Sequence, residues 1–320
     1  MTAEAEKSEG SASDWHSFCA DAIARLETLE LSEDLQIPSL PTALTEFLDA
    51  SARRDFDIRK LGQIVEHDPG MTVDLLKCVN SAANSGYQPV RTPTEALIRL
   101  GVPRARKYLI AAGMRGATLA HQSRLMNHRN FWNESLRRAL FAQNAARNFS
   151  TDLDLAFIGG LLQDFLLPVL TNRYDDQYIQ FLKDEAPKGT ELHTWEQDTF
   201  GWDHASAGAY IAHKWNLPND LLCAILLHHQ MDVPLQASDP RLFSLFPVTL
   251  AALLPDQLSQ VPNGVRKLLD ADQKATIFRL DELCLTVDEE LEKIAEGHDT
   301  PLCLAPVIQQ ARELVAAAAG

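Results

Sequence analysis

Apolar residues recur along almost the whole chain at intervals of three and four, which is the spacing of one face of an α-helix. Ile58, Leu61, Ile64 and Val65 are one example, and Asp57 precedes them in the position of a helix N-cap. No run of alternating β-branched residues bounded by turns interrupts this pattern, so strands are not expected. The sequence therefore predicts an all-α protein.

Turn and capping residues divide the pattern into separate helices. Asp68-Pro69 ends one helix and begins the next, and Thr92-Pro93-Thr94-Glu95 is a capping box that opens a helix ending at Gly101. Asn80-Ser81 is expected to cap a helix end rather than to bind a ligand. Further helices are predicted over Arg104–Ala120, Asn130–Phe149, Leu153–Leu167, Gln177–Ala186, His193–Lys214, Asn219–His229, Leu242–Leu254, Val265–Leu269, Asp288–Glu296 and Pro306–Ala319.

Targeting and membrane signals are absent from the sequence. Residues 1–13 are small and polar and are expected to be disordered. The most apolar window, Ala156 to Leu170, is shorter than the roughly 20 residues that cross a bilayer, so we interpret it as a core helix. The five cysteines are scattered without a C-x-x-C pair, which favours reduced thiols. These features predict a cytoplasmic protein that does not bind membranes.

Positive charge is concentrated in one segment of an acidic chain. The formal net charge is −15, yet residues 91–150 hold eleven Lys and Arg against two Asp and Glu. Arginine suits bidentate binding of phosphate or carboxylate. The predicted binding patch therefore consists of Arg104, Arg106, Lys107, Arg137 and Arg138.

Three interpretations of this basic patch remain open. It is a solvated face balanced by the acidic flanks, a docking site for an acidic signalling protein partner, or a site for a nucleotide or nucleic acid. The acidic chain and the few aromatic residues among these bases make nucleic acid the unlikely partner.

Histidines cluster in the second half of the chain. His193, His204, His213, His228 and His229 lie within 37 residues, near Asp198, Asp203 and the earlier Asp164. Imidazoles and carboxylates on facing helices can hold a divalent metal that acidifies a bound water. Neighbouring helical residues diverge by about 100°, so only one of His228 and His229 is expected to face a given site. The alternative is that these are capping, surface or core histidines.

Several common catalytic motifs are missing. The chain has no P-loop, no G-x-G-x-x-G after a strand, no G-x-S-x-G and no H-E-x-x-H. P-loop ATP hydrolysis, dinucleotide redox chemistry and α/β-hydrolase chemistry lose support accordingly.

A series of short motifs runs from about Leu40 to His229. The first half contains Leu40-Pro41, His67-Asp68-Pro69-Gly70-Met71-Thr72, Lys77-Cys78-Val79-Asn80-Ser81-Ala82 and Ala96-Leu97-Ile98-Arg99-Leu100-Gly101. The second half contains Phe131-Trp132-Asn133-Glu134-Ser135, Phe157-Ile158-Gly159-Gly160-Leu161-Leu162-Gln163-Asp164, His204-Ala205-Ser206-Ala207-Gly208, Trp215-Asn216-Leu217-Pro218 and His228-His229. In this order and at these distances the motifs resemble those of the HDOD domain.

The resemblance implies an all-α relative of the HD phosphohydrolases that lacks a complete catalytic metal set. Active HD enzymes use a His on an early helix, a His-Asp doublet and a further Asp or His. Here Glu134 stands at the early His position and Gln163 at the doublet His, while three metal positions remain: Asp164, His204 and one of His228 or His229. A neutral amide binds transition metals far more weakly than imidazole. The resemblance therefore implies a relic site, with no metal, no cofactor and no catalytic residue.

Taken together, these observations predict an HD-superfamily-like multi-helix core with an additional C-terminal helical extension. A polar, acidic segment covers residues 1–32. The HDOD-like domain covers 33–235 in two helical lobes, about 33–120 and 125–235, and the extension covers 236–320.

The predicted function is non-catalytic signal transduction in a bacterial cell, through recognition of a protein partner or a ligand. One alternative is a divergent metal-dependent phosphohydrolase acting on a cyclic or linear nucleotide, with Asp164, His204 and His228 or His229 as ligands. The second alternative is a nucleotide-sensing module that binds without turnover.

Overall fold

The structure is a computed structural model that describes residues 15–32, 35, 39–53, 55–80, 88–119, 123–294 and 303–319. All regular structure in these ranges is helical, which confirms the predicted all-α class. Residues 1–13 and Ser81, for which disorder and capping were predicted, lie outside the described residues.

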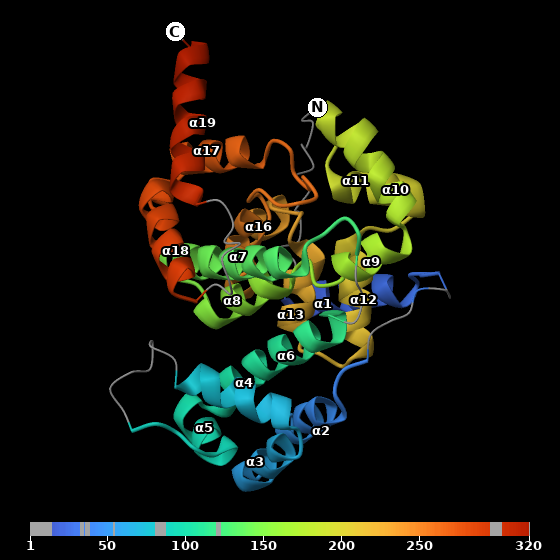
Figure 1. The fold of residues 1–320 in the computed structure, drawn as a ribbon, viewed down its shortest axis with the longest axis vertical. Coiled ribbons are helices and arrows are strands. Elements are labelled where there is room, and N and C mark those ends of the chain that lie inside the picture. The colour runs from blue at the N-terminus through green and yellow to red at the C-terminus, as the bar shows by residue number, and fades with distance from the viewer. Residues whose placement is uncertain are drawn as a thin grey trace, which may run out of the picture.

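The first half of the chain forms α1 to α7 (Figure 1). These helices are α1 (Trp15–Glu27), α2 (Thr42–Ser51), α3 (Ile58–Glu66), α4 (Pro69–Val79), α5 (Pro93–Leu100), α6 (Val102–Leu119) and α7 (His128–Phe149). The second half contains α8 (Leu153–Leu162), α9 (Leu167–Arg173), α10 (Asp175–Gln180), the π-helix η2 (Phe181–Glu185), the 3-10 helix η3 (Ala186–Lys188), α11 (Leu192–Phe200), α12 (His204–Lys214), α13 (Asn219–Leu227), α14 (Asp232–Gln236), α15 (Pro240–Phe243), α16 (Phe246–Ala251), α17 (Gly264–Lys274), α18 (Leu280–Ile294) and α19 (Leu304–Ala319).

The predicted caps of the first helices are present. Asp57 accepts a hydrogen bond from the backbone N–H of Arg59, and Asp68 accepts one from Met71. Thr92 accepts one from Glu95 at 3.2 Å. Asn80 ends α4, and its side-chain amide donates to the carbonyl of Val90 while its oxygen accepts from the Val90 N–H. Asn80 therefore has the structural role that the sequence indicated.

Three predicted helices are each divided in two. The largest correction concerns His193–Lys214, where Gly201 adopts a φ of 81° that ends α11. Asp203 then accepts a hydrogen bond from the Ser206 N–H at 2.7 Å and starts α12 as part of a capping box. Leu153–Leu167 breaks after Leu162, and Leu242–Leu254 breaks between α15 and α16. Apolar periodicity continues across these breaks, so the pattern alone did not reveal them.

Helices α7 and α8 pack closely against each other at the centre of the molecule (Figure 1). Gly160 makes this approach possible, because a Cβ at that position would lie 2.8 Å from the backbone oxygen of Arg138. Helices α2 to α5 form one end of the molecule, and α6 connects that end to α8.

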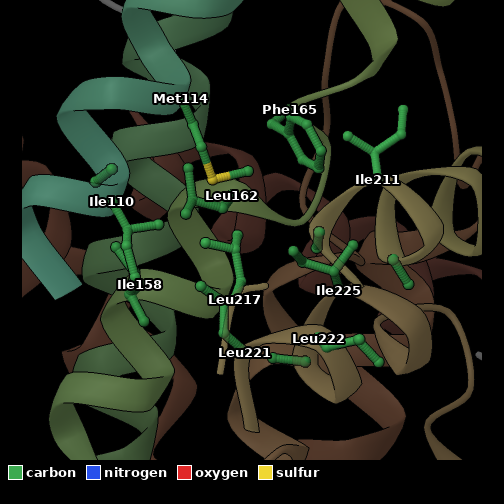
Figure 2. Close-up of a cluster of buried hydrophobic side chains, with 14 of the residues drawn as sticks. Ile110, Met114, Ile158, Leu162, Phe165, Ile211, Leu217, Leu221, Leu222 and Ile225 are labelled. Carbon is green, nitrogen blue, oxygen red and sulfur yellow. The ribbon is translucent and has the colours of Figure 1, made fainter. Parts of the chain in front are cut away.

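The main hydrophobic core lies between α6, α8, α12 and α13 (Figure 2). Ile110 and Met114 of α6 face Ile158 and Leu162 of α8, and all four are at most 1 % exposed. Burial of each such side chain contributes about 1.5–3 kcal/mol. The segment Leu153–Arg173 is long and apolar enough to cross a membrane, but 78 % of its most apolar window is buried inside the protein. This burial agrees with the expected core helix.

The C-terminal segment packs on the same two central helices. A second cluster of buried side chains joins α7 and α8 to α16, α17, α18 and α19. Phe278 contacts the rings of Phe141 and Phe149, with ring centroids 6.1 and 5.9 Å apart. The described residues beyond 236 therefore dock on the core.

Candidate functional site

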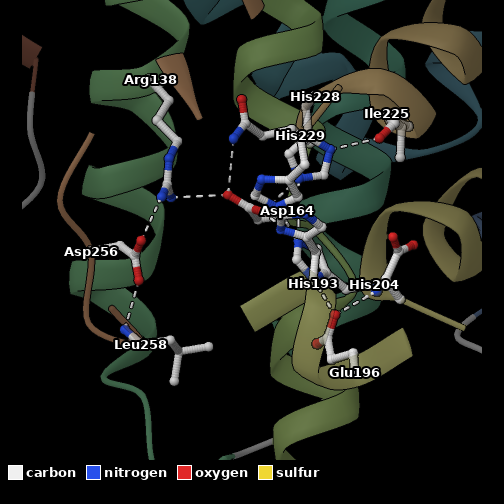
Figure 3. A network of polar contacts seen from close by, with 12 residues as sticks. Arg138, Asp164, His193, Glu196, His204, Ile225, His228, His229, Asp256 and Leu258 are labelled. Carbon is white, nitrogen blue, oxygen red and sulfur yellow. Dashed lines mark hydrogen bonds and ion pairs between the residues drawn. The ribbon is translucent and has the colours of Figure 1, made fainter. Parts of the chain in front are cut away.

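Four potential metal ligands converge in the interior of the protein. They are Asp164, His204, His228 and His229, and their ligand atoms all lie within 4.8 Å of one another. His204 Nε2 is 2.9 Å from His229 Nε2 and 3.2 Å from His228 Nε2. Asp164 Oδ1 lies 3.4 Å from the Nε2 atoms of His204 and His228 (Figure 3).

Both adjacent histidines at the end of α13 reach the site. Helix α13 ends at Leu227, and His228 is its C-cap with torsions that are still helical, φ −62° and ψ −21°. The Nε2 atoms of His228 and His229 nevertheless lie 3.2 and 2.9 Å from His204 Nε2. The expectation that only one of the two faces the site is therefore wrong.

A second layer of hydrogen bonds orients two of the imidazoles. His204 Nδ1 lies 2.5 Å from Glu196 Oε2, and Glu196 Oε1 accepts a hydrogen bond from the Tyr178 hydroxyl at 2.6 Å. His228 Nδ1 lies 2.6 Å from the carbonyl oxygen of Ile225. Such contacts at Nδ1 leave Nε2 directed inward, as in metal sites whose histidines are held by a carboxylate or carbonyl.

Arg138 binds the outer oxygen of Asp164. Its Nη1 is 3.0 Å from Asp164 Oδ2, and its Nη2 is 2.9 Å from Asp256 Oδ2. Gln163 Nε2 also donates to Asp164 Oδ2, at 3.2 Å. All of these side chains are buried. One guanidinium thus lies between two carboxylates.

Burial and charge act in opposite directions on the ionisable groups of the site. Burial alone would raise the pKa of Asp164, but the Arg138 guanidinium and the neighbouring imidazoles hold it well below the usual value. Burial disfavours protonated His204, yet the carboxylates of Glu196 and Asp164 raise its pKa to about 10. Burial and the adjacent imidazoles lower the pKa of His229. Without an ion, the group therefore holds a proton on His204.

The geometry of the four donor atoms suits one metal ion. Four-coordinate sites with bonds of about 2.0–2.1 Å place neighbouring donors roughly 3.3 Å apart. Four of the six donor pairs lie at 2.9–3.4 Å, and the whole group lies within 4.8 Å, so closing around an ion requires small side-chain shifts. Asp164 Oδ1 is buried and makes no hydrogen bond of ordinary geometry with any described residue. A three-imidazole, one-carboxylate set is typical of Zn²⁺ and related divalent transition metals.

The same geometry does not suit a second ion. Asp164 Oδ2 already binds Arg138 and Gln163, so the carboxylate cannot bridge two metals. Glu134 and Gln163, the two substituted positions, are not part of the converging group. Glu134 Oε2 instead accepts a hydrogen bond from Gln257 Nε2 at 3.3 Å.

Comparison with known proteins identifies the fold family. The sequence model of the HDOD domain matches residues 37–231. The chain belongs to the HDOD domain family. An uncharacterized protein of Treponema pallidum (strain Nichols) is 28 % identical over 197 residues, which cover 61 % of this HDOD protein and 38 % of that relative. The chain thus spans well under half the length of the curated relative it matches.

Two solved structures share the fold of this HDOD protein. One, from Marinobacter aquaeolei VT8, is provisionally named a signal transduction protein and has a TM-score of 0.56 at 17 % identity, covering 88 % of this chain and 66 % of its own. The other, from Shewanella amazonensis SB2B, is provisionally named a phosphohydrolase and has a TM-score of 0.55 at 21 % identity, covering 81 % and 97 %. At these identities the likeness concerns the fold alone.

The HDOD protein does not present the predicted basic patch as a surface. Arg137 and Arg138 are only 4 % and 2 % exposed, because α7 lies between α8 and the C-terminal segment. Both guanidinium groups bind acceptors in the loop that contains Pro255 and Asp256. Their assignment to a docking patch is therefore wrong, and charge composition could not reveal it, since the covering segment lies more than 100 residues away.

The other three basic residues lie on α6. Arg104 Nε is 3.8 Å from Asp154 Oδ1, and Lys107 Nζ is 3.6 Å from Asp152 Oδ1. Arg106 forms no such pair with a described residue and faces a cavity considered below.

The remaining clustered histidines lie around the site or away from it. The His193 ring stacks on that of His229 with centroids 4.5 Å apart and covers it from one side. His213 lies at the surface, 3.8 Å from Glu27. Glu196 was not predicted from the sequence as part of the site. It lies eight residues before His204, and only the turn at Gly201 brings the two side chains into contact.

Proposed function

We propose that this HDOD protein is a non-catalytic regulatory module of bacterial signal transduction, which acts in the cytoplasm by recognising a partner protein or a ligand. The observation that carries this proposal is the position of Arg138. Its guanidinium neutralises Asp164 and Asp256 at 3.0 and 2.9 Å, where a second divalent ion would need free carboxylate oxygens. Two-metal phosphoester chemistry depends on an ion at each of the attacking and leaving oxygens.

The coordination number of the site supports the same proposal. A single ion held by Asp164, His204, His228 and His229 has four protein ligands. Catalytic zinc sites typically keep one position open for water, whereas closed four-ligand sites are structural. An ion at this site would therefore join α12, α13 and the segment after α8 without presenting a nucleophile.

The alternative function is a divergent metal-dependent nucleotide phosphohydrolase. It is favoured by the four intact donors and by the phosphohydrolase name of one structural neighbour. The signal transduction name of the other neighbour favours the regulatory proposal. A nucleotide sensor without turnover is the third possibility: it would bind a nucleotide, as a phosphohydrolase does, but would act only in regulation.

A metal-reconstitution experiment separates these functions. Purified protein is stripped with chelator, refilled with Mn²⁺, Fe²⁺ or Zn²⁺, and tested for phosphate release from linear and cyclic nucleotides. We expect no metal-dependent turnover above that of Asp164→Asn, which removes a carboxylate ligand. Metal-dependent turnover that disappears in Asp164→Asn would refute the regulatory proposal. Nucleotide binding measured by calorimetry without turnover would identify the sensor.

A further inference from the structure

One side of α6 faces a cavity of about 270 Å³ that is separate from the histidine site. Its walls come from the segment between α2 and α3, from α6, and from α8 and α13. Its lining includes Phe56, Arg106, Lys107, Leu155, Ile158 and Asp220. Ligand sites are usually concave, mostly apolar and supplied with a few polar groups, and this volume suits a small molecule.

Arg106 is the first of two cations on the α6 side of this cavity. Its Nε is buried and has no hydrogen-bond partner among the described residues. The nearest acids that act on it, Asp49 and Asp220, form no ion pair with it in the described part of the chain, while burial lowers its pKa. A buried donor without an acceptor costs about 1–3 kcal/mol, and more when it is charged. An anionic ligand would satisfy it.

Lys107 adds a second cation at the cavity. Its Nζ lies 3.6 Å from a carboxylate oxygen of Asp152, a residue that is half exposed, so this pair is screened by solvent. The rest of the lining is largely apolar: it includes the buried side chains of Ile110 from α6, Ile158 from α8 and Leu221 from α13 (Figure 2). Phe56 is 41 % exposed at the edge of the cavity.

We infer that this cavity binds a small organic anion, whose phosphate or carboxylate group contacts Arg106 and Lys107 and whose apolar ring or chain fills the space against Phe56, Leu155 and Ile158. The ligand would touch α6 and the first turn of α13, the helix that ends at Leu227 directly before His228. This inference goes beyond the proposed function, and it does not depend on whether the histidine site holds an ion.

The test uses the full chain and isothermal calorimetry with four probes. Phenyl phosphate and octanoate carry an apolar body, while inorganic phosphate and acetate supply the head group alone. We expect at least one of the two organic anions to bind more tightly than its matched head group. Comparing the affinities of phenyl phosphate and octanoate then shows which combination of anionic head group and apolar part the cavity prefers.

Three variants assign the binding to the cavity. Arg106→Gln should weaken the preferred organic anion about tenfold or more, since it removes a charge-assisted hydrogen bond. Phe56→Ala should weaken it while leaving binding of the head group unchanged. Arg104→Gln is the matched control, because Arg104 lies two residues away on α6 but does not line the cavity, and it should bind like wild type. The inference is overturned if neither organic anion exceeds its head group, or if Arg106→Gln binds as tightly as wild type.

Discussion

Arg138 Nη1 lies 3.0 Å from Asp164 Oδ2, and both side chains are 2 % exposed. The same guanidinium binds Asp256, which follows α16 and lies outside the residues matched by the HDOD family model. One buried cation thus connects the family domain to the C-terminal segment.

Loss of Arg138 should destabilise the whole protein. Arg138→Leu removes the cation between two buried carboxylates, which leaves Asp256 unpaired and Asp164 with only the protonated His204 beside it. Breaking a buried pair in this way costs about 3–5 kcal/mol. Chemical denaturation measures the free energy of unfolding. Arg104→Leu breaks a half-exposed pair and should cost less than about 1 kcal/mol. Equal effects of the two substitutions would contradict this account.

Metal loading should stabilise the histidine site. We expect one equivalent of Zn²⁺ to raise the thermal midpoint and Co²⁺ to give the intense visible absorption of four-coordinate geometry. His204→Gln removes a ligand from the centre of the group and should abolish both effects. His213→Gln, on the surface of the same helix, should preserve them. If the wild-type protein binds no ion after refilling, the fit of the donors to a metal is refuted.

The sequence predicted the all-α fold because helix caps and apolar spacing are local properties. Asp57, Asp68 and Thr92 bind backbone groups only two or three residues away, so their roles could be predicted without tertiary structure. The order of the short motifs from about Leu40 to His229 was also sufficient to identify the HDOD family, whose sequence model matches residues 37–231.

The candidate site could be predicted only in part, since its contacts are distant in sequence. The sequence identified Asp164, His204 and one of His228 and His229, but only the structure shows that both histidines join the group. Arg138 was interpreted as a surface residue because its partner Asp256 lies 118 positions away and belongs to no recognised motif. When a side chain is buried by a segment far along the chain, as Arg138 is, the neighbouring sequence carries no pattern that indicates the burial.

Close packing of α7 on α8 should depend on Gly160. Gly160→Ala would place a methyl group 2.8 Å from the Arg138 carbonyl oxygen, and backbone cannot move away as a flexible side chain could. We expect a loss of about 1–3 kcal/mol by chemical denaturation. Gly116→Ala in α6 is the control, because nothing lies within 4 Å of its added Cβ, and it should be neutral or stabilising by up to about 1 kcal/mol. If Gly160→Ala stabilised the protein and Gly116→Ala destabilised it, the packing of α7 on α8 would be looser than described.

Glu134 should make stability depend on pH in a predictable direction. Burial raises its pKa above the value in the unfolded chain, although Arg138 opposes this shift. A raised carboxyl pKa means that the folded state favours the protonated form, so the contribution of this group is present at low pH and is lost as pH rises through the folded pKa.

Glu134→Gln removes the ionisation but keeps an acceptor for Gln257. The variant should therefore be more stable than wild type at pH 8, with a difference that shrinks toward pH 4. Denaturation curves across this pH range measure the difference in free energy of unfolding between the variant and wild type. A difference that grows as the pH falls would show that Glu134 is stabilised as a carboxylate.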